Sequence, residues 1–215
     1  MMNKPTIADY TKLQSLSPES SEFHDLYNQF DWSTQTFQVN GKYGLKNCIG
    51  EQLVAPHYDD FMSLSGSDIA LGRRVVAKKD GLWGVLIANG TGKWLLEPEF
   101  DYIGYPNSIT FVHKEGKYSV IDLSSMKWIV TGCETLSFEQ GFLFVNEIAL
   151  FEKDGKSGVI LPSGEVTPAK FDEITIEDSG YAYAYARIGD IWGYIDVNSN
   201  LVEDMDDAYF IGDSM

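Results

Sequence analysis

The stretch GLWGVLIANGTGKWLLEPEFDYI, residues 81–103, contains the plan of most of the chain. It runs from a glycine through an aromatic-Gly step, an apolar run and a polar turn to a second apolar run that ends in an acid. Four further segments follow this plan, starting at Gly41, Gly116, Gly155 and Asp190. The keyed aromatic position is Tyr43, Trp83, Tyr118, Ser157 and Trp192, at steps of 40, 35, 39 and 35 residues. This period predicts supersecondary units that bury their apolar faces against one another.

Each unit is predicted to be a three-stranded meander. The first strands are expected at 36–40, 74–79, 109–114, 148–153 and 181–188. Asn-Gly and Asp-Gly pairs after most of them favour type I′ hairpins, since both central residues tolerate positive φ. Prolines at 56, 98 and 168 confine the third strand to an edge or end it.

Two patterns within the strands predict close packing. The run YAYAYARI, residues 181–188, puts tyrosines on one face and alanines on the other, so the alanine face should meet another layer closely. Glycines such as Gly84 and Gly193 interrupt the second strands. We expect them to make room for an aromatic ring from the adjoining unit.

The first 35 residues have a helical pattern. Ser17-Pro18 is a helix start with Ser17 as the N-cap, and a shorter helix is expected around 7–13. The expected architecture is therefore all-β, with residues 1–35 as a helical cap over the end of the stack and residues 36–215 as one domain of five repeats. The array is expected to be solenoid-like or propeller-like, and more open than closed.

The Trp-Gly steps at 83–84 and 192–193, with EPEFD at 97–101 and PAKFDEI at 168–174, resemble the WG-repeat family of bacterial proteins. The resemblance covers about residues 37–215. It is weakest in the third unit, where Ser119 replaces the glycine, and in the fourth, where Ser157 replaces the aromatic residue. It implies a β-repeat scaffold for protein interaction without enzymatic activity, and some such repeats serve as immunity proteins of toxin systems.

Composition indicates a folded cytoplasmic protein. With 44% hydrophobic residues the chain can bury a sizeable core. No apolar run reaches the length of a membrane span, and the N-terminus lacks the pattern of a secretory signal. Cys48 and Cys133 form no CxxC pair and are expected to be reduced, with a single disulfide as the alternative.

The net charge of −16 is unevenly distributed. Residues 171–215 contain eleven acidic side chains and one basic one, Arg187. Such a field repels nucleic acid and anionic membranes and attracts cationic partners. The alternative is that acidity only keeps a β-rich protein soluble and blunts its edge strands.

Motifs of catalysis or metal binding are missing from the sequence. His24, His57 and His113 have no metal-ligand spacing, and the acidic run at 203–207 lacks the glycine and glutamate of a calcium loop. The acids that follow the third strands, such as Asp59, Asp101 and Asp172, are expected to cap turns. We therefore expect no enzyme, no cofactor and no metal.

The leading hypothesis is an acidic immunity protein that binds and occludes a cognate, basic toxin domain. No nucleic acid or membrane partner is expected. The candidate partner-binding residues are Glu173, Glu177, Asp178, Glu203, Asp204, Asp206 and Asp207, with Tyr209 as an aromatic anchor. The alternatives are a structural or adaptor module in which acidity serves solubility alone, and an enzyme or ligand-binding β-array with a pocket between units.

Overall fold

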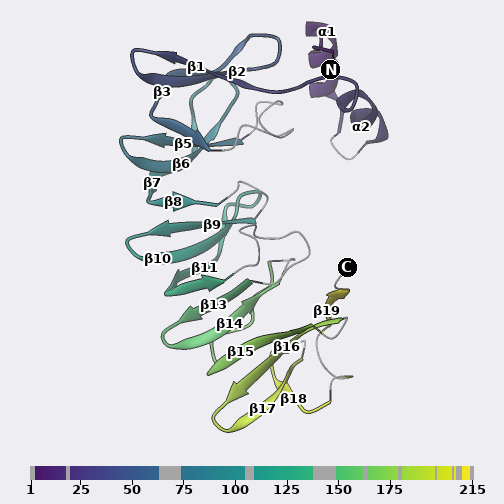
Figure 1. The fold of residues 1–215 in the computed structure, drawn as a ribbon, viewed down its shortest axis with the longest axis vertical. Helices are drawn as coiled ribbons and strands as arrows, with labels where there is room; N and C mark the ends of the chain where they lie inside the picture. Colours follow the sequence, from purple (N-terminus) through teal and green to yellow (C-terminus); the bar gives the residue numbers. More distant parts are fainter. Residues whose placement is uncertain are drawn as a thin grey trace. The chain divides into compact units, whose positions relative to one another are not determined.

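The prediction of an all-β repeat chain is confirmed. The computed structural model describes residues 3–17, 20–62, 74–104, 109–137, 149–161, 164–178, 181–196, 198–204, 206 and 210–213, with the backbone alone at 176–178, 181–183 and 210–213. These residues form five antiparallel sheets and two short helices (Figure 1). Neither a solenoid nor a propeller is established by these elements, so the open array stays a prediction.

Two compact units make up the chain, Met1–Asp101 and Tyr102–Met215. Among the described residues, the first holds both helices and two sheets, and the second holds three sheets. The expected division into residues 1–35 and 36–215 stays a prediction.

The two helices belong to the first unit. Helix α1 (Ile7–Ser15) is capped by Thr6, which exchanges hydrogen bonds with Asp9 in a capping box. Helix α2 (Ser21–Tyr27) starts later than expected, because Ser20 and not Ser17 is its N-cap. The Ser20 hydroxyl accepts a hydrogen bond from the Phe23 N–H at 3.2 Å.

The helices pack around an aromatic cluster of their own. Its buried members are Tyr10, Leu13, Phe23, Leu26 and Trp32. The cluster meets the first sheet at Cys48 and Ile49, in the turn between the second and third strands. Strand β1 (Gln35–Val39) keeps four of its five residues exposed. The two helices therefore lie on this turn and leave most of β1 exposed.

The first unit has one sheet of three strands and one of four. The strands of the first sheet are, in spatial order, β1 (Gln35–Val39), β2 (Lys42–Lys46) and β3 (Gln52–Tyr58). Those of the second sheet are β4 (Asp60–Met62), β5 (Arg74–Lys79), β6 (Leu82–Ile87) and β7 (Trp94–Phe100).

The second unit continues the pattern with three sheets. They are β8 (Tyr102–Ile103), β9 (Ile109–Lys114), β10 (Lys117–Asp122) and β11 (Lys127–Cys133); β12 (Thr135–Ser137), β13 (Ala149–Lys153) and β14 (Lys156–Ile160); and β15 (Glu173–Asp178), β16 (Tyr181–Ile188), β17 (Ile191–Ile195) and β18 (Leu201–Val202), with β19 (Phe210–Asp213) on β16. The third strand of the fourth repeat is reduced to two bridges, Ile160 to Val166 and Ser157 to Phe171. The expected strand residue Ile148 lies outside the described residues.

An extra strand joins each sheet after the first. The segment that follows the trailing acid of one repeat pairs with the first strand of the next repeat, as Asp60 does with Lys78 and Glu173 with Arg187. Strands β4, β8 and β12 have only two or three residues. That length is too short for a period-two pattern, so the sequence predicted three strands in every repeat, whereas two sheets have four strands and the last has five.

The hairpin turns behave as their residues predict. At Asn40-Gly41 the φ angles are 51° and 80°, and three further turns also have positive φ at both central positions. In the fifth turn only Gly189 has positive φ, at 62°, which is the type II′ pattern with glycine first.

The strand glycines make room for groups of their own sheet. A β-carbon at Gly44 would lie 2.7 Å from Cζ of Phe37, its cross-strand partner, and 2.7 Å from the Val54 carbonyl oxygen. The expectation of a ring from the adjoining unit is therefore wrong. In the third repeat Ser119 occupies the glycine position, and its hydroxyl accepts a hydrogen bond at 3.1 Å from the N–H of Gly132 on β11.

Each sheet has two distinct faces because side chains alternate along the strands. We call the side of the keyed residue the aromatic face; in order it carries Tyr43 and Leu45, Trp83 and Val85, Tyr118 and Val120, Ser157 and Val159, and Trp192 and Tyr194. The opposite side, the glycine face, carries Gly44 and Lys46, Gly84 and Leu86, Ser119 and Ile121, Gly158 and Ile160, and Gly193 and Ile195.

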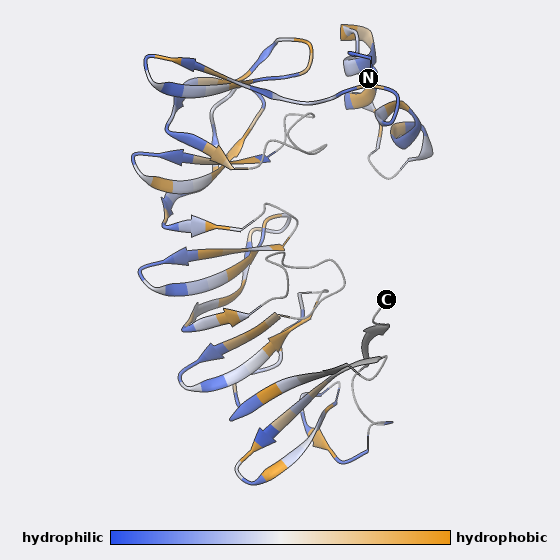
Figure 2. Cartoon of the chain, viewed as in Figure 1, coloured by the Kyte–Doolittle hydropathy of each residue, from blue (hydrophilic) through white to orange (hydrophobic). Residues whose placement is uncertain are grey.

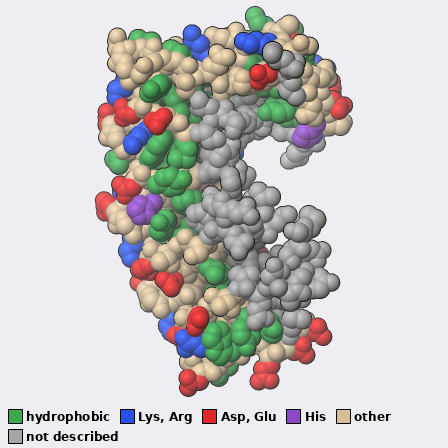
Figure 3. Space-filling view, in the orientation of Figure 1, with side chains coloured by type: hydrophobic (Ala, Val, Ile, Leu, Met, Phe, Trp, Pro, Cys, Tyr) green, Lys and Arg blue, Asp and Glu red, His purple; other side chains and the backbone are tan. Residues whose placement is uncertain are grey.

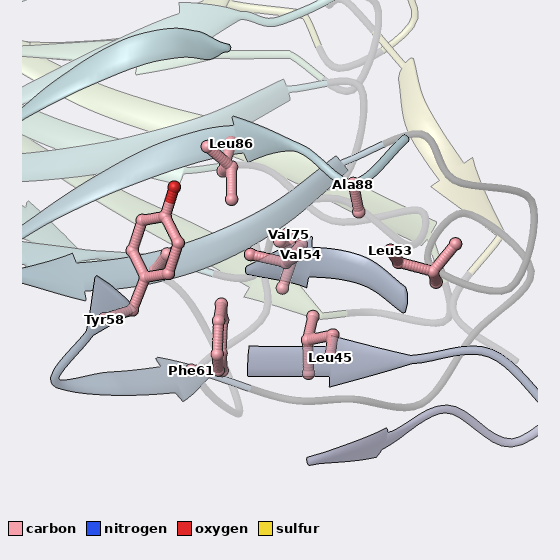
Figure 4. Close-up of a cluster of buried hydrophobic side chains, with 9 residues drawn as sticks. Leu45, Leu53, Val54, Tyr58, Phe61, Val75, Leu86 and Ala88 are labelled. Atoms are coloured by element: carbon pink, nitrogen blue, oxygen red, sulfur yellow. The ribbon is translucent and has the colours of Figure 1, made fainter. Parts of the chain in front are cut away.

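The core forms where the aromatic face of one sheet packs on the glycine face of the next. In the first unit Leu45 and Val54 meet Val75, Leu86 and Ala88 (Figure 4). In the second unit Val120 packs with Phe151 and Ile160, and Val159 packs with Ala184 and Ala186. Each fully buried side chain of this size contributes about 1.5–3 kcal/mol.

Polar residues gather at the hairpin tips, and the strands carry the apolar ones further along (Figure 2). The expected close approach at the alanine face of β16 is confirmed, because Ala184 and Ala186 are 5% and 0% exposed.

Candidate functional site

The predicted acidic residues fall into two groups in the last sheet. Glu173 and Glu177 lie on β15 and pair in register with Arg187 and Tyr183, on the alternation of the aromatic face. Asp178 pairs with Ala182, on the opposite alternation.

The second group follows β18. Glu203, Asp204 and Asp206 are exposed, and the Asp204 carboxylate accepts a hydrogen bond from the Asp206 N–H at 3.0 Å. Val202, the last residue of β18, pairs with Tyr194 on β17. The three acids therefore follow an edge strand of the same sheet. Asp207 and Tyr209 lie outside the described residues.

Three aromatic side chains on this sheet were not among the predicted site residues. The Tyr185 and Trp192 rings stack with centroids 5.4 Å apart and an interplanar angle of 16°. The Tyr194 ring lies 4.9 Å from Tyr185, and Arg187 lies 5.7 Å from the Trp192 centroid. Trp192 is 39% exposed, and Tyr185 and Tyr194 are half-buried.

This aromatic group is surrounded by charge. The Glu173 carboxylate lies 3.6 Å from Arg187 Nε, and its side chain is 51% exposed. In Figure 3 hydrophobic side chains gather at the lower end of the view, over the last sheet, with acidic side chains at their border. The alternation of YAYAYARI already placed tyrosines on one face, and that signal could have identified Tyr185. The exposure of Trp192 depends on packing and had no signal in the sequence.

Other acids are structural, as the prediction of turn capping required. Asp59 pairs with Lys42 of its own hairpin and accepts a hydrogen bond at 3.1 Å from the N–H of Gly81 in the next hairpin turn. Asp172 does the same with Lys156 and with the Gly189 N–H, at 2.6 Å. We call this arrangement the turn clamp.

Glu134 forms a third turn clamp. It lies 2.5 Å from Lys117 and accepts the Asp154 N–H at 3.0 Å. In the second repeat the position of the clamp lysine is occupied by Leu82.

The turn clamps shift the pKa values of their acids. The hydrogen bond from Lys42, followed by that from the Gly81 N–H, holds the pKa of Asp59 below its ordinary value of 3.8. Lys117 and Lys156 lower the pKa of Glu134 and of Asp172 in the same way. These acids are therefore ionised at neutral pH, and their carboxylates hold the hairpin turns in place.

A cavity of about 430 Å³ lies in the first unit, between the start of α1 and the turn after β2. It is lined by Lys4, Pro5, Thr6, Ile7, Gln35, Asn47, Cys48, Ile49 and Gly50. The Asn47 amide oxygen is already used by the N–H groups of Ile49 and Glu51. The titratable side chains of its lining are Lys4 and Cys48.

Cysteine, metal and membrane features complete the survey. Cys48 and Cys133 are free, and burial raises the pKa of both thiols. Within the described ranges no three His, Cys, Asp or Glu side chains are grouped as metal ligands. No helix in the described part of the chain has the length and apolarity to cross a membrane.

Solved structures offer distant likenesses. Those of HIRA(644-1017), Hsv2 of Kluyveromyces lactis and the N-terminal domain of Nup159 match with TM-scores of 0.33, 0.35 and 0.27 at 16%, 8% and 7% identity. The matches cover 60%, 75% and 57% of this chain and 46%, 59% and 40% of those chains, less than two thirds in each case. No curated protein matches the sequence.

A family model matches part of the repeat array. The model of the WG containing repeat covers residues 87–118, from the end of β6 to the start of β10. The match indicates a repeat-containing protein-interaction module. The resemblance to the WG-repeat family seen in the sequence is thereby confirmed over residues 87–118.

Proposed function

We propose that this chain is a non-enzymatic, cytoplasmic protein-binding module, and more concretely an immunity protein that occludes a basic bacterial toxin domain. The observation that carries the proposal is the concentration of acid at the last sheet. Of its acidic residues, Glu173, Glu203, Asp204 and Asp206 are exposed and take no part in a turn clamp. The scaffold acids Asp59, Glu134 and Asp172 are accounted for by their clamps.

Electrostatic steering would supply the mechanism. Residues 171–215 carry a net charge of −10, since eleven acids face one arginine. Such a field raises the rate of association with a cationic surface. Dissolved salt screens the field, which decays over about 8 Å at physiological ionic strength. The aromatic side chains beside the acids would supply the buried contacts that slow dissociation.

A structural or adaptor role is the second candidate. The turn clamps favour it, because they show that part of the acidity belongs to the scaffold and needs no partner. In this role the remaining acids would keep the sheet edge soluble and block edge-to-edge pairing.

Charge reversal tests the first role. Glu203→Lys, Asp204→Lys, Asp206→Lys and Asp207→Lys are combined, and a cationic protein captured by the wild-type chain serves as the partner. We expect slower association and a weaker dependence of its rate on salt. Reversal of Glu22 and Asp25, which are exposed on α2 with Glu22 3.0 Å from Lys12, is the control for charge reversal away from the last sheet. Unchanged association by the four-residue variant would refute the acidic binding surface.

Co-expression separates the two roles. A toxin captured in this way should arrest growth when expressed alone and become harmless beside the wild-type chain. Capture of several partners, none of them toxic, would instead support the adaptor role.

A further inference from the structure

The aromatic face of a sheet is normally a packing surface in this chain. The first, third and fourth sheets each bury theirs under the glycine face of the following sheet, at Leu45, Val120 and Val159 respectively. These three residues are at most 1% exposed. The aromatic face of the last sheet therefore continues an established type of interface.

That last face is partly exposed, with Trp192 39% exposed and Tyr185 and Tyr194 more deeply buried, and it has a different composition. Where the earlier sheets have leucine or valine it has Tyr194, and where the fourth has Leu150 it has Tyr185. Together with Trp192 they form three adjoining rings. Aromatic side chains of this size each bury about 150–250 Å² when covered, which is enough to anchor an interface.

The charges of this face argue against an apolar occupant. Glu173 and Arg187 both lie on it, 3.6 Å apart. An aliphatic sheet like those inside the array would take both charges out of water without new partners, which costs several kcal/mol. A second copy is also disfavoured, because two faces that each belong to a segment of net charge −10 repel one another.

A cation fits the face. Arg187 already lies over the Trp192 ring, and elsewhere Lys78 lies 5.3 Å from the Trp83 centroid. Arg187 lies over Trp192 alone among these rings, and Tyr185 and Tyr194 are the next pair of residues on this face along β16 and β17. Guanidinium groups stack on aromatic rings and also pair with carboxylates such as Glu173 and Glu203.

We propose that the aromatic face of the last sheet is a docking surface for the arginine side chains of a cationic protein. This inference rests on the proposed function, since it identifies the chemistry by which the same acidic end holds its partner. The acids attract the partner at long range, and the rings select arginine over lysine at contact.

Two peptides of equal length and charge, one rich in arginine and one rich in lysine, test the proposal. Their affinities for the full chain are measured by titration at about 0.15 M salt. We expect the arginine peptide to bind roughly two- to tenfold more tightly, and Trp192→Leu to remove that preference. Trp192→Phe keeps an aromatic face and should preserve it.

Trp128→Leu on β11 is the matched control, because Trp128 is 45% exposed and belongs to another sheet. It should leave the preference unchanged. Thermal unfolding by circular dichroism checks that each variant is folded, and the Trp192 indole N–H resonance of the wild-type chain should shift on addition of the arginine peptide.

The outcomes separate this inference from the proposed function. If Glu203→Gln with Asp204→Asn and Asp206→Asn weakens both peptides while Trp192→Leu changes neither, the docking surface is refuted and the acidic binding surface stands. If neither variant changes binding, both proposals fail. Self-association of the wild-type chain that Trp192→Leu abolishes would identify a second copy as the occupant and overturn the inference.

Discussion

The first and last sheets each have a face that is partly exposed to solvent, and the two faces are built differently. On the glycine face of the first sheet, Gln35 and Lys46 occupy the positions that Val75 and Leu86 hold in the second sheet. On the aromatic face of the last sheet, Tyr194 occupies the position of the buried Val159.

The glycine face of the first sheet carries polar side chains suited to contact with water. Lys46 lies over the Phe37 ring, with its ammonium 4.7 Å from the centroid, so the ring is partly shielded by a charged group. Polar outer faces of this kind are what terminal repeats need for solubility. The last face keeps three rings where a polar cap would suffice. The difference teaches that the repeat plan alone does not decide whether a partly exposed face is polar or aromatic.

The largest effect on stability should come from exchanging residues between the buried glycine face of the second sheet and the partly exposed glycine face of the first. Leu86→Lys places a charge at a position that is 0% exposed, and we expect the free energy of unfolding to fall by about 3–5 kcal/mol. Lys46→Leu makes the reverse exchange at the outer face and should change it by less than about 0.5 kcal/mol. Urea denaturation followed by circular dichroism measures both. Equal effects would mean that the two faces are equally covered.

The aromatic face offers the second exchange. Val159→Tyr gives the fourth sheet the residue of the last one, in a core with no room for it, and should destabilise the chain by about 1–3 kcal/mol. Tyr194→Val should cost less, about 0.5–1.5 kcal/mol, because Tyr194 is only partly buried and loses its ring contact with Tyr185. Thermal and urea unfolding measure the difference in stability between the two variants. Equal losses of stability would mean that Val159 and Tyr194 have similar surroundings.

Loss of a turn clamp should have a smaller effect. Asp59→Ala removes both the ion pair and the acceptor for the Gly81 N–H, and it should cost about 1–2 kcal/mol at pH 7. Because the pKa of Asp59 is lowered in the folded state, its contribution is complete above pH 3.8 and is lost as the pH falls through the folded value. The difference from the wild-type chain should therefore shrink below pH 3.8.

The neighbouring Asp60→Ala is the control for this variant, because Asp60 is exposed and bonds only to the adjacent Phe61 N–H among its described contacts. Unfolding measured from pH 7 to pH 3 compares the two. A constant difference across that range would exclude the proposed role of the Asp59 carboxylate.

The smallest expected change in the free energy of unfolding is an increase. Thr110 is 1% exposed, and its hydroxyl has no hydrogen-bond partner among the described residues. Thr110→Val removes this unsatisfied group and should raise the free energy of unfolding by about 1 kcal/mol. Gln35→Val, at the equivalent position on the outer face, should give no such gain. A loss of stability in Thr110→Val would show that the hydroxyl is satisfied in solution.

Local chemistry made the repeats predictable. Asn-Gly and Asp-Gly turns need positive φ at both central residues, and the alternation of YAYAYARI assigns its faces, so hairpins and strands follow from short stretches. The candidate site was predictable only in part. Charge counting found Glu173 and Glu203, whereas Tyr185 and Trp192 were assigned to the scaffold because their positions are scaffold in every earlier repeat.

The sequence by itself determined the five repeats, the hairpin types and the acidity of the last one, because these depend on residues close together in the chain. Only the tertiary structure decided that Gly44 faces Phe37 of its own sheet, that Asp59 clamps the next hairpin, and that Trp192 remains exposed. The physical reason is that burial is a property of neighbouring sheets: identical positions are core where a sheet follows and surface where none covers them.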